Sequence, residues 1–153
     1  MTEISPGRPE RPFADALRRL KKAKLRPTRQ RLALGKLLFD GGDRHVTAES
    51  LHDEAMRHSI RVSLATVYNT LNQFTAAGLL REVVVAPGRS YFDTNIADHH
   101  HFFYEDDGAL EDIPGAAITL ATLPELPRPA RRCNASMWWY ACGVTTLYQT
   151  NLY

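Results

Sequence analysis

Cysteine is almost absent from this chain of 153 residues, which contains only Cys133 and Cys142. These two residues form no Cys-x-x-Cys pair and both lie in the last 21 residues, so a disulfide framework is excluded. Long apolar runs are also missing, since none approaches the ~18 residues that a membrane span requires. The charged, proline-containing N-terminus has no signal-peptide core. These absences predict a soluble, cytoplasmic protein.

Charge of one sign is missing from two parts of the chain, although the net charge of +2 is ordinary. Residues 95–127 contain 7 acidic and no basic side chains, and residues 128–153 contain 3 arginines and no acidic side chain. Residues 1–94 hold 16 Lys and Arg against 10 Asp and Glu. A basic front before an acidic middle indicates two units with different partners, and the basic unit favours nucleic acid.

Helical periodicity dominates the basic front of the chain, beginning at Phe13. Three later residues are suited to cap the N-terminus of a helix, namely Thr28, Thr47 and Ser63. Apolar residues after each cap recur at the spacing of a buried helix face, and in the third helix this face includes Met56. The pattern therefore predicts a series of short helices packed around one core.

The period changes after Gly78, a residue that fits the end of a helix. Residues 80–85 and 90–93 are strand-like and flank Pro87-Gly88, a pair that fits the centre of a type II turn. Short helices followed by a hairpin are the order of a winged helix-turn-helix. We predict this DNA-binding domain over residues 13–93, behind a disordered leader of residues 1–12.

A second, smaller unit is predicted over residues 99–127, after a hinge at residues 94–98. Residues 100–104 and 109–113 are strand-like, with a turn at Asp106-Asp107-Gly108 between them. So short a segment cannot bury an independent core, which favours dimerisation with a second copy. The predicted fold class is α+β, an N-terminal winged helix-turn-helix followed by a small α/β dimerisation and sensing domain.

The helix predicted from Ser63 to Ala77 has an exposed face without Lys or Glu. On a helical wheel Leu64, Val67, Leu71 and Phe74 face the core. The opposite face and its flank carry groups that read base edges, because Asn and Gln can bond adenine and Ala and Thr methyl groups can meet a thymine methyl. The candidate DNA-reading residues are Ala65, Thr66, Tyr68, Asn69 and Gln73.

Phosphate-binding charge is predicted outside that helix, including Arg29 and the wing residue Arg89. This division matches proteins in which phosphate contacts position the protein and base contacts specify the sequence. A polar surface without function is the alternative interpretation of the helix face taken alone. Together with the basic front and the hairpin, the face favours binding to double-stranded DNA.

Three adjacent histidines, His99, His100 and His101, begin the second unit. On a strand His99 and His101 share one face, while His100 points to the other. Two imidazoles on one face can bind a divalent metal, or one or two histidines can be axial ligands of haem iron. The aromatic residues 102–104 that follow favour a dimer core over packing on a porphyrin. An exposed histidine run without a ligand is the remaining alternative.

The string Ser63-Leu64-Ala65-Thr66-Val67-Tyr68-Asn69-Thr70-Leu71 resembles the recognition-helix signature of the ferric uptake regulator family. Residues 25–31 resemble the entry into that family's second helix, and the resemblance covers about residues 13–125. Asn69, where most members have Arg, and the histidine triplet are similar to the iron response regulator branch. The resemblance implies a homodimer on a roughly palindromic operator, with Tyr68 and its helix in the major groove.

The resemblance also implies a regulatory metal site, because His45, Asp93, His99 and His101 occupy the family's ligand positions. In the iron response branch, His99, His100 and His101 correspond to a triplet implicated in haem binding, which lowers DNA binding. The Cys-x-x-Cys pairs of the family's structural zinc are missing, which argues against a structural zinc site built from four cysteines. An N-terminal Cys-Pro haem motif is missing too, so haem sensing would depend on the histidines.

The function predicted from these features is a sequence-specific transcriptional regulator, mainly a repressor, of iron and haem metabolism genes. Haem or a divalent metal, iron, manganese or zinc, would control it. The alternatives are a metal-responsive regulator of the same family and a non-regulatory protein that binds haem or metal. No nucleophile–base pair, phosphate loop or deep carboxylate pair supports an enzyme.

The resemblance stops at Arg128, and residues 128–153 form an atypical tail. Residues 133–153 contain no charged side chain but include Trp138 and Trp139. A frameshift or assembly error is one explanation, and a lineage-specific tail that covers the dimer surface is the other. Translation of the coding DNA in its other frames separates them, since the absence of a family-like ending in every frame excludes the error.

Overall fold

Two compact units make up the chain, whose computed structural model describes residues 13–118 and 144–147. The first unit extends to residue 82 and also includes residues 90–96, and the second contains residues 83–89 and those from 97 onward. No helix in the described part of the chain is long and apolar enough to cross a membrane. The leader of residues 1–12 predicted to be disordered lies outside the described residues.

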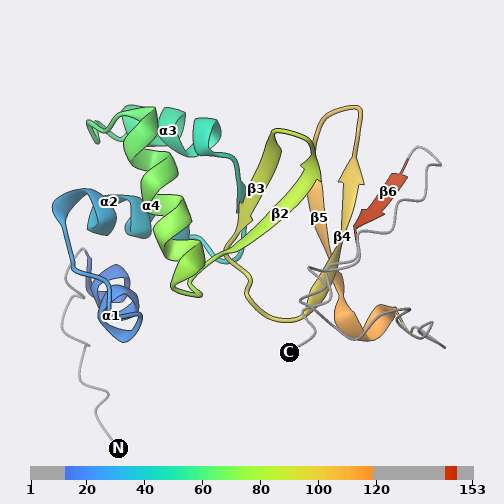
Figure 1. Ribbon diagram of the computed structural model, residues 1–153, viewed down its shortest axis with the longest axis horizontal. Helices are drawn as coiled ribbons and strands as arrows, with labels where there is room; N and C mark the ends of the chain where they lie inside the picture. Colours follow the sequence, from blue (N-terminus) through green and yellow to red (C-terminus); the bar gives the residue numbers. More distant parts are fainter. Residues whose placement is uncertain (1–12, 119–143, 148–153) are drawn as a thin grey trace, which may run out of the picture. The chain divides into compact units, whose positions relative to one another are not determined.

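Four helices begin the first unit (Figure 1): α1 (Ala14–Lys22), α2 (Arg29–Phe39), α3 (Ala48–Arg57) and α4 (Leu64–Ala76). The predicted N-caps are confirmed, since the side chains of Thr28, Thr47 and Ser63 each accept a hydrogen bond from a backbone N–H in the first turn of the next helix. Helix α4 ends where predicted, because Gly78 has a φ of +70° that an L-residue with a Cβ rarely adopts.

A three-stranded sheet has the strand order β1-β3-β2, in which β1 (His45–Val46) lies between α2 and α3 in the chain and β2 (Arg81–Ala86) and β3 (Arg89–Asp93) follow α4. The predicted hairpin between β2 and β3 is confirmed, and Gly88 at its turn has the positive φ of +75° that a type II turn requires. Strand β1 was not predicted, because two residues show no periodicity. The helices and this sheet confirm the predicted winged helix-turn-helix.

The core of the first unit consists of apolar side chains from its helices and its sheet. The fully or almost fully buried members include Leu20, Leu34, Leu38, Val46, Leu51, Val67, Leu71, Phe74 and Phe92. Two predicted core positions are wrong, since Met56 is 50% exposed and Leu64 is 37% exposed. Met56 lies in the last turn of α3 and Leu64 is the first residue of α4, where a helix end has neighbours on fewer sides.

The second unit contains a separate sheet in the order β5-β4-β6, with β4 (His99–Tyr104) paired antiparallel to β5 (Leu110–Pro114) and to β6 (Val144–Leu147). The predicted second hairpin is thus confirmed to within about one residue at its ends. A 3-10 helix, η1 (Gly115–Ala117), follows β5. Strand β6 comes from the segment considered an atypical tail, whose other residues, 128–143 and 148–153, lie outside the described residues.

Arg44 connects β1 to its surroundings in the first unit through charged and backbone hydrogen bonds. Its guanidinium donates to both carboxylate oxygens of Glu54 in α3, at 2.7 and 3.1 Å, and to the Leu37 carbonyl at 3.2 Å. Its backbone N–H donates to Oγ1 of Thr94 at 2.8 Å, and the Thr94 N–H donates to the Arg44 carbonyl at 3.1 Å. Thr94, the first residue of the predicted hinge, is therefore bound to the start of β1.

Replacement of Glu54 with alanine removes the partner of Arg44 and is expected to lower the free energy of unfolding by about 1–2 kcal/mol. The loss is not larger because Arg44 is about a third exposed, so solvent screens the pair. The Arg44 hydrogen bonds lower the pKa of Glu54 below its ordinary value of 4.5. Its contribution is therefore complete above that value and is lost as the pH falls through the lower folded-state pKa. Urea unfolding of both proteins from about pH 7 down to about pH 3 checks this, and a difference that persists unchanged at about pH 3 would contradict it.

Candidate functional site

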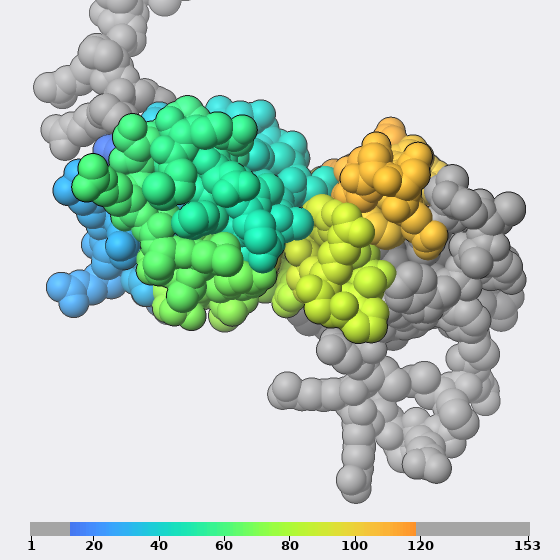
Figure 2. Space-filling model, turned by 90° about the horizontal axis from the view of Figure 1, so that it is seen from above, coloured from blue at the N-terminus to red at the C-terminus, as the bar shows by residue number. Residues whose placement is uncertain are grey.

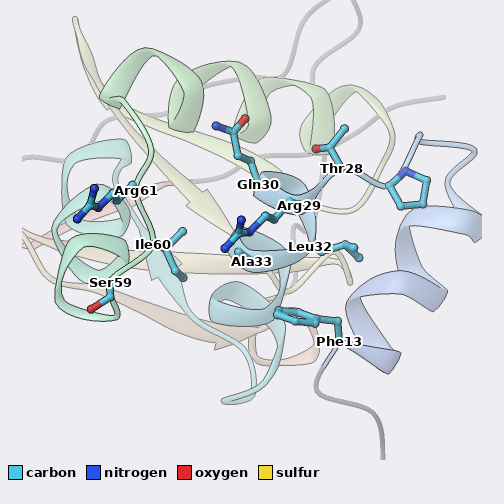
Figure 3. Close-up of a pocket in the computed structure, with 10 residues that line it drawn as sticks. Phe13, Thr28, Arg29, Gln30, Leu32, Ala33, Ser59, Ile60 and Arg61 are labelled. Atoms are coloured by element: carbon cyan, nitrogen blue, oxygen red, sulfur yellow. The ribbon is translucent and has the colours of Figure 1, made fainter.

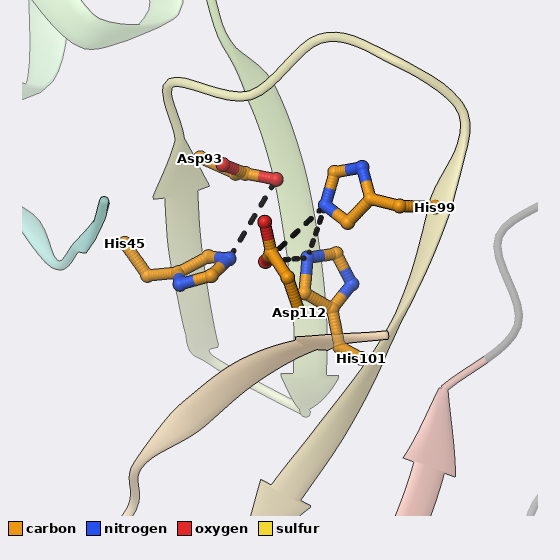
Figure 4. Close-up of side chains that lie close together, drawn as sticks. All are labelled: His45, Asp93, His99, His101 and Asp112. Atoms are coloured by element: carbon orange, nitrogen blue, oxygen red, sulfur yellow. Dashed lines mark hydrogen bonds and ion pairs between the residues drawn. The ribbon is translucent and has the colours of Figure 1, made fainter. Parts of the chain in front are cut away.

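The first group of potential metal ligands, His45 and Asp93, lies in the first unit. These residues are direct partners in the antiparallel pairing of β1 with β3, so their side chains lie on one face of the sheet. Nε2 of His45 is 3.6 Å from Oδ2 of Asp93 (Figure 4). Asp93 is fully buried, and its Oδ1 accepts a hydrogen bond of 2.7 Å from the Asn95 N–H. The pair offers one imidazole nitrogen and one carboxylate oxygen.

The second group, His99, His101 and Asp112, lies in the second unit. His99 and His101 share a face of β4, as strand alternation predicted, and are 3% and 0% exposed. Asp112 is the partner of His101 across the pairing of β4 with β5. Its Oδ1 lies 3.4 Å from Nε2 of His99 and 3.5 Å from Nε2 of His101, and the two Nε2 atoms are 2.9 Å apart. Figure 4 shows the three side chains pointing toward one another.

The spacing of these three donor atoms fits a bound metal ion. Two ligands held at ~2.0–2.1 Å by a tetrahedral Zn²⁺ lie about 3.3 Å apart, close to the three observed separations. Nδ1 of His99 lies 2.8 Å from the Ala97 carbonyl oxygen, which can only accept a hydrogen bond. Nδ1 is therefore the donor in this contact, and Nε2 is the ring nitrogen that faces His101 and Asp112. The second group is consistent with a divalent metal site.

The structure thus brings the four predicted metal ligands into two pairs, His45 with Asp93 and His99 with His101. Sequence reasoning missed the fifth donor, Asp112. Its signal was available, because the predicted hairpin turn sets the register that places Asp112 opposite His101. His100, a predicted haem ligand, lies on the other face of β4 and is partly exposed.

The predicted DNA-reading face of α4 is exposed along most of its length. Tyr68 is 41% exposed, Ala65, Asn69 and Gln73 are exposed as well, and Thr66 is partly exposed. The opposite face is buried and apolar apart from Thr70. Figure 2 shows α3 and α4 side by side on one face of the first unit, in teal and green. The helix therefore presents polar and small side chains to an incoming partner.

Two residues of this face have hydrogen-bond partners from other helices. The Tyr68 hydroxyl donates to Oε1 of Glu49 in α3 at 2.6 Å. Oε1 of Gln73 accepts hydrogen bonds from Nε and Nη2 of Arg31 in α2. A bidentate contact with adenine requires both the oxygen and the NH₂ of a Gln side chain, so in this conformation Gln73 has only its NH₂ group to offer.

Arg29, one of the predicted phosphate-binding residues, lines a groove of about 850 Å³ in the first unit (Figure 3). Apolar side chains in its wall include Phe13, Leu32 and Ile60, and Arg61 lies on the loop that precedes α4. Arg29 is also the first residue of α2, whose N-terminal backbone N–H groups favour an anion. The groove therefore has a positive edge.

Arg89, the predicted phosphate-binding residue of the wing, is exposed at the start of β3. Its guanidinium lies 5.3 Å from the ring centre of Phe103, within the range of a cation–π interaction. Arg89 and Phe103 both belong to the second unit, so the charge of Arg89 has an aromatic partner within its own unit.

The protein combines a winged helix-turn-helix with a β-rich unit that carries paired histidines and carboxylates. Comparisons with known proteins identify the family to which this combination belongs. Residues 22–122 match the Ferric uptake regulator family. A ferric uptake regulation protein of Klebsiella pneumoniae is 32% identical over 135 residues, which cover 86% of this chain and 87% of the relative.

Solved structures agree with this match. The ferric uptake regulator of Pseudomonas aeruginosa with manganese has a TM-score of 0.60 and 31% identity over 67% of this chain and 78% of its own. The Vibrio cholerae ferric uptake regulator has a TM-score of 0.59 and 31% identity over 65% of this chain and 76% of its own. The chain belongs to the ferric uptake regulator family. It is a metal-responsive, DNA-binding transcriptional regulator and not an enzyme.

Proposed function

We propose that one divalent ion, bound by His45, Asp93, His99, His101 and Asp112, controls the binding of this chain to a specific DNA sequence. The observation that carries the proposal is the triangle of donor atoms formed by the last three residues, with edges of 2.9, 3.4 and 3.5 Å. A site with three protein ligands has an open position for further donors. His45 and Asp93 supply donors of the same chemical types.

The covalent connection between the two groups supports a shared ion. Only residues 94–98 separate Asp93 from His99, so the chain itself keeps the two groups within a short span. An ion held by both groups would restrict the orientation of the first unit relative to the second. In a homodimer that restriction would set the spacing of the two recognition helices, which must match the two halves of a palindromic operator.

The donor set favours manganese, iron or zinc. Imidazole and carboxylate ligands together suit these ions, whereas Cu(I) prefers sulfur and Mg²⁺ prefers oxygen alone. The Pseudomonas aeruginosa regulator, 31% identical, was solved with manganese. We therefore propose Mn²⁺, Fe²⁺ or Zn²⁺ as the effector and genes of metal homeostasis as the targets.

Haem is the less favoured effector, because two of the three histidines predicted to bind it are almost inaccessible. His99 and His101 are 3% and 0% exposed and face a carboxylate, whereas haem iron needs room for a porphyrin beside its axial ligand. Membership of the iron response regulator branch, with control of iron and haem genes, depends on Asn69 and the histidine triplet and stays a prediction.

The DNA contacts proposed for this chain come from the first unit and the wing. The exposed face of α4 would enter the major groove with Tyr68 and Asn69 at the base edges. Arg29 and the wing residue Arg89 would contact phosphates. Arg61, which was not among the predicted residues, lies on the same groove as Arg29 and is a further candidate for a phosphate contact.

The test is to select duplexes from a random-sequence pool with the purified chain and Mn²⁺, and then to measure affinity with and without a chelator. We expect an enriched palindromic sequence and at least a tenfold loss of affinity on chelation, a coupling of about 1.4 kcal/mol. Restoration by Mn²⁺ but not by haem would support the ion. Affinity that is unaffected by chelation, or restored by haem alone, would overturn the proposal.

A further inference from the structure

We propose that Glu49 is a positioning residue that holds Tyr68 in α4 and thereby restricts which base edges the helix accepts. This inference rests on the DNA-binding function proposed above. It names the chemistry that Tyr68 reads, the amino groups of cytosine or adenine in the major groove. The juxtaposition that carries it is a hydrogen bond of 2.6 Å from the Tyr68 hydroxyl to Oε1 of Glu49.

Glu49 is fixed in place by the start of α3. It lies in the first turn of that helix, two residues after the N-cap Thr47. Thr47 and Ser50 form a capping box, in which each side chain bonds the other's backbone N–H, so this turn is well defined. A carboxylate here is favoured by the positive end of the helix dipole. Glu49 is therefore a preorganised acceptor beside the recognition helix.

The charge states of the pair follow from their contact. The Tyr68 hydroxyl, followed by backbone and Thr47 hydrogen bonds, lowers the pKa of Glu49 below its ordinary value. The same contact raises the pKa of Tyr68 above its ordinary value, so Tyr68 keeps its proton and remains the donor. At neutral pH the pair is a phenol that donates to a carboxylate, a short charge-assisted hydrogen bond.

This hydrogen bond changes what Tyr68 can recognise. A free tyrosine hydroxyl can donate or accept, but here its single hydrogen is directed to Glu49. The phenol oxygen and the second carboxylate oxygen can then act toward a base only as acceptors. In the major groove the base-edge donors are the N4 amino group of cytosine and the N6 amino group of adenine. Guanine O6 and thymine O4, which are acceptors, would be rejected.

The carboxylate of Glu49 also lowers the affinity for DNA in general. Glu49 is exposed and places a negative charge next to the helix that approaches DNA. This charge repels phosphates and lowers the affinity for DNA of every sequence. A base amino group that donates to the pair offsets this loss, but only in sequences that place cytosine or adenine there. Tyr68 is 41% exposed, and a hydrogen bond that fixes its side chain before DNA arrives reduces the entropy lost on binding.

The experiment compares wild type, Glu49→Ala, Glu49→Gln and Tyr68→Phe on two duplexes, the one that the wild type enriches from a random pool and a scrambled version. The quantity measured is the ratio of the two dissociation constants, together with the dependence of affinity on salt. Asp53→Ala is the matched control, because Asp53 is an exposed carboxylate on the same helix whose Oδ1 lies 3.8 Å from Nδ1 of His52. Thermal unfolding of each variant checks that the fold is retained.

For Glu49→Ala we expect the ratio to fall about tenfold, with a gain in affinity for the scrambled duplex. Glu49→Gln retains an acceptor oxygen for Tyr68 and is expected to keep most of the ratio. In the combined variant Glu49→Ala/Tyr68→Phe, the ratio should fall little further than in the single variant with the larger effect. The reason is that both substitutions remove the same interaction.

Two outcomes would overturn the inference by itself. One is a Glu49→Ala ratio equal to that of the wild type, and the other is an equal fall in the ratio for Asp53→Ala. If the wild type enriches no sequence from the pool, the proposed DNA-binding function and this inference fail together. The enrichment step therefore separates failure of the function from failure of the role given to Glu49.

Discussion

Replacement of His101 with alanine is expected to weaken binding of Mn²⁺ or Zn²⁺ by about 100-fold or more, because loss of a direct ligand should cost at least as much as loss of a residue that supports one. His101 is fully buried, and its Nε2 is close to both other donors of its group, Nε2 of His99 and Oδ1 of Asp112. Without it, one nitrogen and one oxygen remain in the second unit. Competition with a fluorescent chelator measures the change directly.

A matched control for this prediction is His52→Ala. His52 is a partly exposed histidine on α3 whose Nε2 lies 3.2 Å from the Val62 carbonyl oxygen, outside the two ligand groups. Its replacement should leave the ion affinity unchanged. Asp112→Asn preserves the shape of the side chain but removes its charge, and it should also weaken binding. An affinity in His101→Ala within a factor of about three of the wild type would exclude this residue as a ligand.

Replacement of Phe74 with alanine is expected to lower the free energy of unfolding by about 3–5 kcal/mol. Phe74 is completely buried on the apolar face of α4, and its ring stacks on Phe39 of α2 with the ring centres 6.2 Å apart. Alanine would remove both the buried area and this contact, and it would leave a cavity between two helices. Urea unfolding followed by circular dichroism gives the difference in stability.

The control for Phe74 is Asn72→Ala, an exposed position on the same helix. This change should alter stability by less than about 0.5 kcal/mol, because the side chain stays in contact with water when the protein folds. A loss below about 1 kcal/mol in Phe74→Ala would mean that neighbouring side chains fill the space.

Local features of the fold could be predicted from the sequence, because their physical causes are local. The caps at Thr28, Thr47 and Ser63 depend on side chains that bond backbone groups within the same turn. The end of α4 at Gly78 and the hairpin turn at Gly88 depend on a backbone conformation that glycine adopts without strain. A single residue type at a single position is enough to indicate each of them.

Features that depend on contacts between distant residues could not be predicted in the same way. Glu49 meets Tyr68 nineteen residues away in the chain, and Arg31 meets Gln73 forty-two residues away. Neither contact has a spacing that identifies it, because the packing of one helix on another decides it. The exposure of Leu64 at the start of α4 was missed for a related reason, since a helical wheel does not show where the core ends.

The two groups of potential metal ligands include features that could be predicted from the sequence and features that could not. Alternation along β4 was enough to predict that His99 and His101 share a face. The pairing of His45 with Asp93 came only from resemblance, because nothing in two residues predicts strand β1. Asp112 required the register of the second hairpin, which follows from the turn but was not worked out to individual residues.

That register limits how the turn of residues 105–109 can change in length during evolution. Asp112 faces His101 because the two residues are opposed across β4 and β5, with His100 opposite Ile113 on the other face. If the insertion of one residue shifts this pairing by one, Ile113 exchanges faces with Asp112 and meets the histidines with an apolar side chain. A shift by two residues places Leu110 or Pro114 opposite His101, and neither side chain can bind an ion. The ion site therefore depends on the register of β5 against β4, and a change in the length of the turn is tolerated only where that register is kept.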